Sequence, residues 1–377
     1  MTNITTDSPS TPRAPRLEGI SVAKLLLEGR AFFALLAIIA VFSFLSPYYF
    51  SVSNFLTMAS HVAIFGVLAL GMLLVILNGG IDLSVGSTLG LAGVIAGFLM
   101  QGVALPMFGV VLFPAVWVVV VLACAMGALV GLVNGVLIAR FKVPAFVATL
   151  GTLYVVRGIA LLMTNGLTYN NLGGTPELGN TGFGWLGFNR LFNVPIGVLV
   201  LAAIAVLGSI MLNRTVFGRW LYASGGNERA AELSGVPVKK VQIQVYVMSG
   251  VCAAIAGLIV SSQLTSAGPT AGASYELTAI AAVVIGGAAL TGGKGNVRGT
   301  LLGAFVIGFL SDGLVIIGVS AYWQTVFTGA VIVLAVLLNA IRYRRTKRPG
   351  AGSGPMPSPL HGGTAREAGA TQEKKAG

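Results

Sequence analysis

Charged residues, cysteines and histidines are scarce in this chain of 377 residues. Only 9% of its residues are Asp, Glu, Lys or Arg, whereas soluble domains usually contain about 25%. The only cysteines, Cys124 and Cys252, lie inside apolar runs, which excludes a disulfide framework and a zinc motif. The sequence shows no acidic pair and no nucleophile near a histidine that would form a catalytic site. We therefore expect no metal, no bound cofactor and no enzyme activity in this chain.

Long apolar stretches dominate the sequence instead. Hydrophobic residues make up 55% of the chain, and the mean hydropathy is +0.89. A helix of about 20 apolar residues crosses a hydrocarbon layer of about 30 Å. We therefore predict an all-α polytopic membrane protein with about ten transmembrane helices, some of them broken by Gly. The ten apolar windows fall near 31–50, 56–77, 83–105, 108–139, 144–164, 194–213, 241–262, 275–291, 299–319 and 322–341.

The positions of the basic residues predict the orientation. If ten spans alternate from a cytoplasmic N-terminus, every Lys and Arg except Arg157 and Arg190 falls on the cytoplasmic side, where short basic loops remain. The net charge of +12 thus reports topology, and nothing predicts a nucleic-acid partner. We expect a flexible cytoplasmic leader over 1–30, a transmembrane domain over 31–341 and a basic, disordered cytoplasmic tail over 342–377.

Two loops between the apolar windows stand out. The segment 214–240 carries five Lys or Arg against two Glu. Its middle predicts a short helix, because Asn227 can cap it, Glu228 suits its positive end and Gly235 can stop it. Such a helix under the membrane could be offered to a soluble partner. The segment 165–193 is the longest predicted external loop, and it is either a flexible crossing with interfacial aromatic residues or a docking surface for an external partner.

A polar turn interrupts the apolar sequence at residues 78–84. Gly79 and Gly80 break the preceding run, and Asp82 or Ser84 can cap the helix that follows. Acidic groups at membrane depth are costly and are functional candidates by default. Two interpretations stay open for Asp82: a helix cap at a turn, or a residue that borders a path or gate through the membrane.

Two further acidic residues fall within or beside predicted spans. Glu276 begins the window 275–291, where it either compensates the helix dipole or lines a path. Asp312 is isolated in an apolar run, and we expect it to hydrogen-bond a neighbouring helix.

Five segments, in this order, resemble the ribose-type permease subunits of bacterial ABC sugar importers. The resemblance covers about residues 30–341. The segments are NGGIDLSVGS (78–87), PAFVATLGTLYVVRG (144–158), GRWLYASGGNERAAELSGVPVKKV (218–241), PTAGASYELTAIAAVVIGGAALTGGKG (269–295) and GTLLGAFVIGFLSDGL (299–314).

The resemblance implies a permease in the bacterial inner membrane that forms the translocation path for a pentose, hexose or polyol. Its implied partners are a second permease copy or a paralogue, an ABC ATP-binding subunit that uses ATP and Mg²⁺, a periplasmic sugar-binding protein and the lipid bilayer. The turn with Gly79, Gly80, Asp82 and Ser84 would border the path.

The resemblance also makes 214–240 the coupling loop to the ATPase. Importer permeases carry an E-A-A-x-x-x-G pattern there, and this chain has Arg229 in place of the Glu. The implied coupling residues are Asn227, Glu228, Arg229, Ala230, Ala231, Glu232, Leu233 and Gly235.

Two alternatives remain at this stage. One is an ABC permease for nucleosides or branched-chain amino acids, which uptake assays would distinguish. The other is a secondary transporter coupled to an ion gradient through Asp82 or Asp312, which would work without an ATPase subunit.

Overall fold

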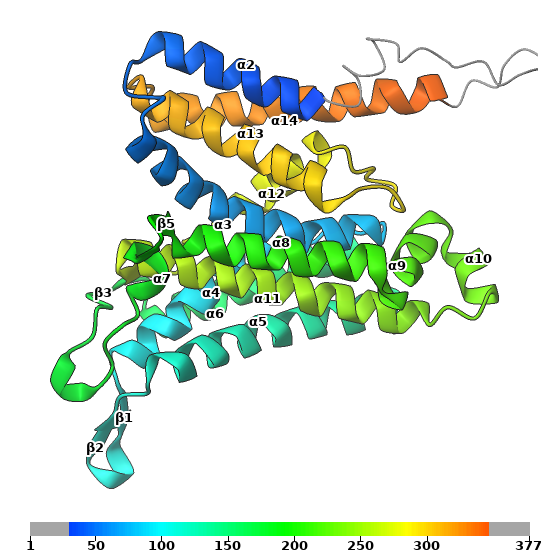
Figure 1. The fold of residues 1–377 in the computed structure, drawn as a ribbon. Coiled ribbons are helices and arrows are strands. Elements are labelled where there is room, and N and C mark those ends of the chain that lie inside the picture. The colour runs from blue at the N-terminus through cyan, green and yellow to red at the C-terminus, as the bar shows by residue number, and fades with distance from the viewer. Residues whose placement is uncertain (1–29, 347–377) are drawn as a thin grey trace, which may run out of the picture. The chain divides into compact units, whose positions relative to one another are not determined.

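The computed structural model of the chain describes residues 30–346. Of these, residues 30–339 belong to one compact unit, and residues 340–346 at the end of the last helix belong to a second. The predicted leader and basic tail lie almost entirely outside the described residues. The helices are α2 (Arg30–Leu45), α3 (Val52–Leu77), α4 (Val85–Met100), α5 (Val116–Ala139), α6 (Ala145–Thr164), α7 (Trp185–Phe188), α8 (Ile196–Arg214), α9 (Val216–Gly226), α10 (Glu228–Leu233), α11 (Val238–Leu264), α12 (Tyr275–Ile285), α13 (Val297–Ile316) and α14 (Ala321–Thr346) (Figure 1).

Helices α3 and α11 form the centre of the first unit. Ser51 caps α3 by accepting a hydrogen bond from the backbone N–H of Asn54, at 3.2 Å. Of the most apolar stretch of α3, 83% is buried, compared with 22% in α6. Apolar helices that leave most of their surface uncovered by protein suit a lipid environment. The difference in buried fraction therefore separates a centre covered by protein from helices such as α5 and α6, whose apolar surface suits lipid.

Each of the ten predicted windows contains an α-helix. Within the described residues, six helices are long and apolar enough to cross a membrane, namely α3, α5, α6, α8, α11 and α13. The apolar helices α2, α4 and α12 are shorter. A mostly helical, multi-pass membrane protein is thus what the structure supports, and the count of ten spans remains a prediction.

A β-hairpin replaces the facing ends of two predicted spans. The windows 83–105 and 108–139 were wrong there, because α4 ends at Met100 and α5 begins only at Val116. Between them, β1 (Val103–Leu105) pairs antiparallel with β2 (Val110–Leu112) around a 3₁₀ turn over Pro106–Phe108. The turn ends at Gly109 with φ +64°, a left-handed conformation that favours glycine.

The predicted window 275–291 also ends too late. Helix α12 stops at Ile285, and its 11 residues span only about 16 Å. Gly286 packs directly on the backbone of Gly299 in α13, so a side chain at Gly286 has no room. Gly287 and Gly292 then adopt positive φ values, which an α-helix does not accommodate.

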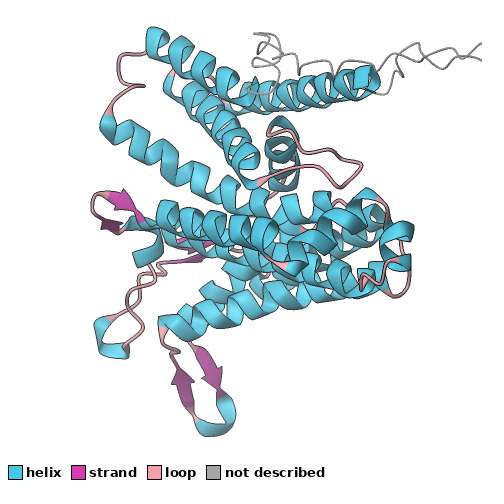
Figure 2. Ribbon diagram, turned by 45° about the vertical axis from the view of Figure 1, so that its right-hand side comes forward, coloured by secondary structure: helices cyan, strands magenta, loops and turns pink. Residues whose placement is uncertain are grey.

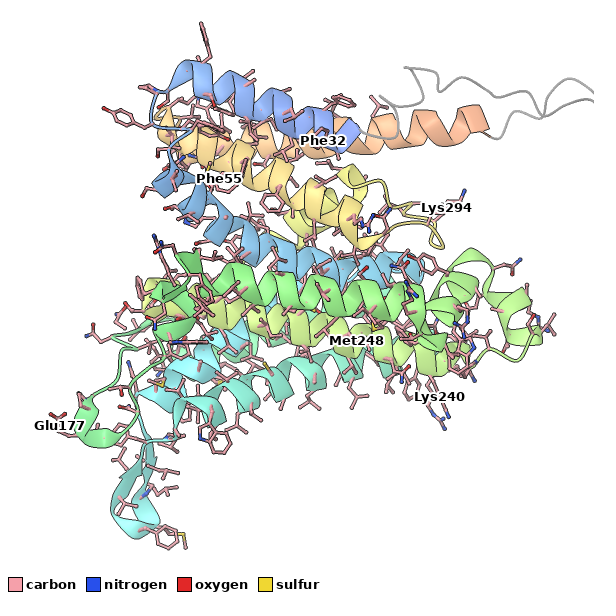
Figure 3. All side chains as sticks on the ribbon, in the orientation of Figure 1. Phe32, Phe55, Glu177, Lys240, Met248 and Lys294 are labelled. Atoms are coloured by element: carbon pink, nitrogen blue, oxygen red, sulfur yellow. The ribbon has the colours of Figure 1, made fainter. Side chains whose placement is uncertain are left out.

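The loops of this unit gather at two opposite ends of the helices. Helices α9 and α10 lie at one end, and the β1–β2 hairpin lies at the other (Figure 1). Lys240 and Lys294 share the end with α10, whereas Glu177 lies at the opposite end (Figure 3). The strands also lie at this opposite end (Figure 2). They include the pairs β3 (Tyr169–Asn170) with β6 (Ser266–Ala267) and β4 (Arg190–Leu191) with β5 (Val194–Pro195).

Candidate functional site

The short helix expected in the coupling loop is present as α10. Asn227 caps it, because its Oδ1 accepts the backbone N–H of Ala230 at 3.0 Å. The chain leaves the helix through Gly235, which has φ +82°. The cap, the helix and its stop were all predicted from the local sequence, and the structure confirms them.

Helix α10 presents a mixed polar and apolar surface. Arg229 pairs with Glu232 at 3.1 Å, and both side chains are exposed. Leu233 is 74% exposed and follows Glu232 in the sequence, so an apolar side chain lies next to that pair. Ala231 is the buried residue of α10. All its other residues are exposed, so Arg229, Glu232 and Leu233 lie on its outward surface together with Glu228 and Ala230.

The turn between α5 and α6 is tied to α10. Lys142 Nζ lies 3.2 Å from Glu228 Oε1, so this turn and the first turn of α10 form an ion pair. Sequence reasoning did not find Lys142, although its place in the short basic segment 140–143 was a signal for the same membrane side.

Helix α9 links the coupling loop to the interior and was not predicted. Gly225 packs against the carbonyl of Leu77, at the end of α3, and against Gly293. Gly293 in turn donates its N–H to the carbonyl of Leu77 at 2.9 Å. Tyr222 donates its hydroxyl to the carbonyl of Gly295 at 2.8 Å, and burial raises the pKa of this hydroxyl, so it stays protonated. The loop 214–240 thus contacts the end of α3 at Leu77 and the segment after α12 at Gly293 and Gly295.

The α3–α4 turn (residues 78–84) is organised around the Asp82 carboxylate. Oδ1 accepts hydrogen bonds from the backbone N–H of Ser84 at 3.0 Å and from the Ser84 hydroxyl at 2.6 Å. Oδ2 accepts the hydroxyl of Ser249 on α11 at 3.0 Å. Asn134 on α5 donates to the Ser84 hydroxyl at 2.8 Å. Asp82, which is only 1% exposed, therefore ties the start of α4 to α5 and α11.

Further buried polar groups surround this turn. The Tyr246 hydroxyl and the Asn134 Oδ1 have no hydrogen-bond partner in the described protein. Gly80 lies so close to the Tyr246 hydroxyl that any side chain there would collide with it, and Gly79 has φ +83°. The two glycines thus permit a polar break inside an otherwise apolar bundle.

A second break lies before α12, in the α12 entry segment (residues 268–275). Arg157 on α6 holds this segment by donating from Nη1 to the carbonyls of Pro269 at 2.5 Å and Ala271 at 2.8 Å. The charge count had singled out Arg157 only as an exception. That it holds other backbone groups could have been inferred from the free-energy cost of a charge in a membrane span, since an arginine there needs polar partners.

The first turns of α4 and α12 meet at Glu276. The Glu276 carboxylate lies against Gly86, and the carbonyl of Gly272 lies against the same glycine. Gly90, one turn further along α4, faces the carbonyls of Pro269 and Ala271. Glycines on one face of α4 thus let the α12 entry segment approach the helix backbone. Glu276 and Arg157 are half-buried opposite charges near this junction.

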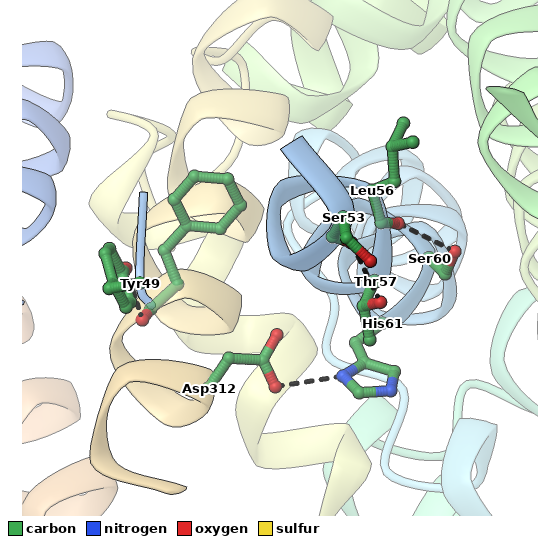
Figure 4. A network of polar contacts seen from close by, with 8 residues as sticks. Tyr49, Ser53, Leu56, Thr57, Ser60, His61 and Asp312 are labelled. Carbon is green, nitrogen blue, oxygen red and sulfur yellow. Dashed lines mark hydrogen bonds and ion pairs between the residues drawn. The ribbon is translucent and has the colours of Figure 1, made fainter. Parts of the chain in front are cut away.

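Asp312 has a partner in a different part of the unit. Its Oδ1 lies 2.9 Å from Nδ1 of His61 on α3 (Figure 4). Nearby, Tyr49 donates its hydroxyl to the carbonyl of Phe309 on α13 at 3.0 Å. The expected bond from Asp312 to a neighbouring helix is thus present. His61, a lone histidine in an apolar run, was the signal for it.

The six candidate path residues do not form one cluster. Gly79, Gly80, Asp82 and Ser84 share the α3–α4 turn, and Glu276 lies against the helix that follows it. Asp312 is instead paired with His61 on α3.

Comparison with known proteins identifies the family. The pattern of the family described as "branched-chain amino acid transport system / permease component" matches residues 54–336. The chain belongs to this permease family. The ribose import permease RbsC of Escherichia coli K12 is 43% identical over 314 residues, which cover 83% of this chain and 94% of that protein. RbsC of Bacillus subtilis 168 is 42% identical over 309 residues, or 82% and 91% of the two chains.

A more distant relative of this permease is an import permease for galactose and methyl galactoside. The galactose/methyl galactoside import permease MglC of Escherichia coli K12 is 35% identical over 329 residues, which cover 85% of the permease and 96% of that protein. No solved structure matches the chain. The ribose-type resemblance is confirmed, and the chain is a transport subunit and not an enzyme.

Proposed function

We propose that this permease is the membrane subunit of a bacterial ABC importer for a monosaccharide, a ribose-like pentose or a galactose-like hexose or polyol. The observation that carries the proposal is the 43% identity to a ribose import permease over 94% of that protein's length. The family description mentions branched-chain amino acids, but the similar full-length relatives have names of sugar permeases. This comparison disfavours a nucleoside or amino acid permease and an ion-coupled transporter.

The protein would lie in the inner membrane with ten spans and both termini in the cytoplasm. Six described helices have the length for it, the shorter α2, α4 and α12 would cross together with adjoining segments, and α14, with 26 residues, would be the tenth span. The leader, the transmembrane domain over 31–341 and the basic tail would be its three parts. Lys240 and Lys294 at the end that carries α10 support a cytoplasmic location of that end.

Helix α10 would be the docking element for an ABC ATP-binding subunit. ATP and Mg²⁺ would be used by that subunit, with no cofactor bound by the permease itself. Arg229, Glu232 and Leu233 offer charge and one apolar anchor to such a partner. Movement of α10 would pass through α9 to Leu77 and Gly293, since Gly225 touches both. Those two residues adjoin the α3–α4 turn and the loop after α12.

The translocation path would run beside the junction of α4 and α12, completed by a second permease copy or a paralogue. In this proposal Glu276 borders the path, because it is half-buried and lies where two helix starts meet. Gly79 and Gly80 permit the turn to bend, and the Asp82–Ser84 pair braces it. Asp312 would act with His61 as a clamp between α3 and α13.

The proposal is tested by uptake into proteoliposomes that contain the permease, its ATP-binding subunit and a periplasmic sugar-binding protein. Labelled ribose, other pentoses, galactose and polyols are offered with and without ATP. We expect ATP-dependent uptake of one sugar class. Uptake that follows a proton or sodium gradient without ATP would contradict the proposal.

A further inference from the structure

The β1–β2 hairpin is an apolar projection that neither the path nor the coupling loop uses. From Gly102 to Val116 the sequence contains no charged residue and no side chain that can form a hydrogen bond. At the tip, Met107 is 94% exposed and Phe108 is 74% exposed. All three residues of β2 are exposed as well. A contiguous apolar surface of this kind is unfavourable in water and marks an interaction surface.

A second projection at the same end differs in that it offers polar side chains as well as exposed apolar ones such as Phe192. The loop 165–193 and the hairpin both extend from the end of the helices opposite α10 (Figure 1). The loop carries several Asn and Thr residues, the exposed Glu177 and Arg190. A soluble partner that docks from the aqueous side can form hydrogen bonds with side chains of the loop 165–193. The hairpin offers such a partner no hydrogen bond from a side chain.

The hairpin is continuous with a surface that faces lipid. Only residues 113–115 separate β2 from α5, one of the six helices with the length of a membrane span. Trp117 in the first turn of α5 is 71% exposed, as expected for a tryptophan at a membrane interface. Further along α5, Val121 and Leu129 are also exposed apolar side chains. The apolar surface therefore runs from the hairpin onto the outside of α5.

We propose that the β1–β2 hairpin is a lipid anchor that inserts into the outer leaflet, where headgroups meet acyl chains. Among the described residues the two strands pair only with each other, in the register Val103 with Leu112 to Leu105 with Val110. Their outer edges leave backbone N–H and C=O groups that the hydrocarbon centre cannot satisfy. The interfacial level supplies water to these groups and still takes up Met107 and Phe108. The anchor would hold the outer end of α4, whose inner end lies at the Glu276 junction.

The depth of the hairpin tip is measured with a nitroxide label. Cys124 and Cys252 are first replaced by Ala, and Met107→Cys is labelled in vesicles of phosphatidylethanolamine and phosphatidylglycerol. Glu177→Cys on the polar loop is the matched control. We expect the label at 107 to be relaxed by oxygen in the lipid and shielded from a water-soluble nickel complex. The label at 177 should show the inverse accessibility.

A second pair of variants tests the cause of the insertion. Phe108→Asp should shift the label at 107 toward the aqueous reagent, because a carboxylate resists burial in lipid. Phe108→Leu should leave it shielded. A label at 107 that is as accessible to the nickel complex as the label at 177 would overturn the anchor. Shielding only after the sugar-binding protein is added would also overturn it, in favour of a protein-docking surface.

The test is independent of the proposed transport function. Labelling reports membrane depth whichever solute the permease carries, and failure of sugar uptake leaves the accessibility ratio unaffected.

Discussion

The α3–α4 turn and the α12 entry segment are two breaks in apolar sequence that have similar signals and different structures. Each combines glycines with one acidic residue, Asp82 or Glu276. Asp82 is fully buried and accepts three hydrogen bonds. Glu276 is half-buried, and Arg157 holds its segment through backbone carbonyls instead. The comparison teaches that an acid in a membrane span braces the fold where side chains of other helices donate to it, as at Asp82, and is a candidate path residue where only its own segment does, as at Glu276.

Removal of the Asp82 carboxylate should have the largest effect. Asp82→Ala leaves two hydroxyls and one backbone N–H without their acceptor, and each buried donor left unsatisfied costs about 1–3 kcal/mol. We expect a large loss of thermal stability in detergent and loss of uptake. Ser249→Ala, which removes one of the three bonds, should lose distinctly less. Unchanged stability of Asp82→Ala would contradict the bracing role.

Glu276→Gln should affect transport more than stability. Its carboxylate is bonded by backbone groups of Ser274 and Glu276, and no side-chain hydroxyl donates to it among the described residues, so we expect the fold to tolerate the uncharged amide. We expect the apparent affinity or rate of sugar uptake to change by about tenfold, equivalent to about 1.4 kcal/mol, with a melting temperature near that of the unmodified protein. If Glu276→Gln instead loses stability as Asp82→Ala does, the two breaks have the same role and the distinction is wrong.

Arg157 tests how the second break is held. Arg157→Gln removes the donor to the carbonyls of Pro269 and Ala271, so we expect a moderate loss of uptake rate with assembly preserved. Arg190→Gln on the external loop is the matched control and should be neutral. Rates are compared at saturating sugar, and equal losses in both variants would count against a positioning role.

Leu233 tests whether the loop 214–240, which contacts the end of α3 before the α3–α4 turn, binds the ATP-binding subunit. Leu233→Asp changes an exposed side chain, so the permease should fold normally while stimulation of the partner ATPase and uptake fall. Leu233→Met, of similar volume and polarity, should retain both. Ala231 is less suitable, because it is buried and its replacement by a large residue would distort the loop itself. Normal coupling in Leu233→Asp would remove this residue from the docking surface.

The smallest effect is expected for His61, which lies outside both breaks. His61→Gln replaces the partner of Asp312 by an amide that can still donate a hydrogen bond, at a pair in which His61 is 48% and Asp312 17% exposed, so we expect a loss of about 0–1 kcal/mol. A small decrease in melting temperature with near-normal uptake is the expected result. Abolished uptake would instead place the His61–Asp312 pair in the transport mechanism.

Local signals in the sequence predicted local structure well. The helix α10, with its cap at Asn227 and its stop at Gly235, depends on atoms only a few residues apart.

The β1–β2 hairpin was not predicted, and the reason is also physical. A window average registers only apolar composition, which the hairpin shares with a span. Pro106, Gly109 and Pro114 were the turn signals that distinguish it.

The sequence by itself determined that this chain is a helical membrane protein, because about twenty apolar residues per window and basic loops follow directly from the cost of burying charge in lipid. The resemblance of five segments then indicated a permease. The sequence also indicated the coupling helix and the acidic candidates. Only the tertiary structure decided what surrounds those acids. Ser249 is 167 residues from Asp82, and His61 is 251 residues from Asp312. Contacts of this kind depend on how whole helices pack, so the same type of residue became a buried brace, a junction residue and an ion-pair partner at three places in one fold.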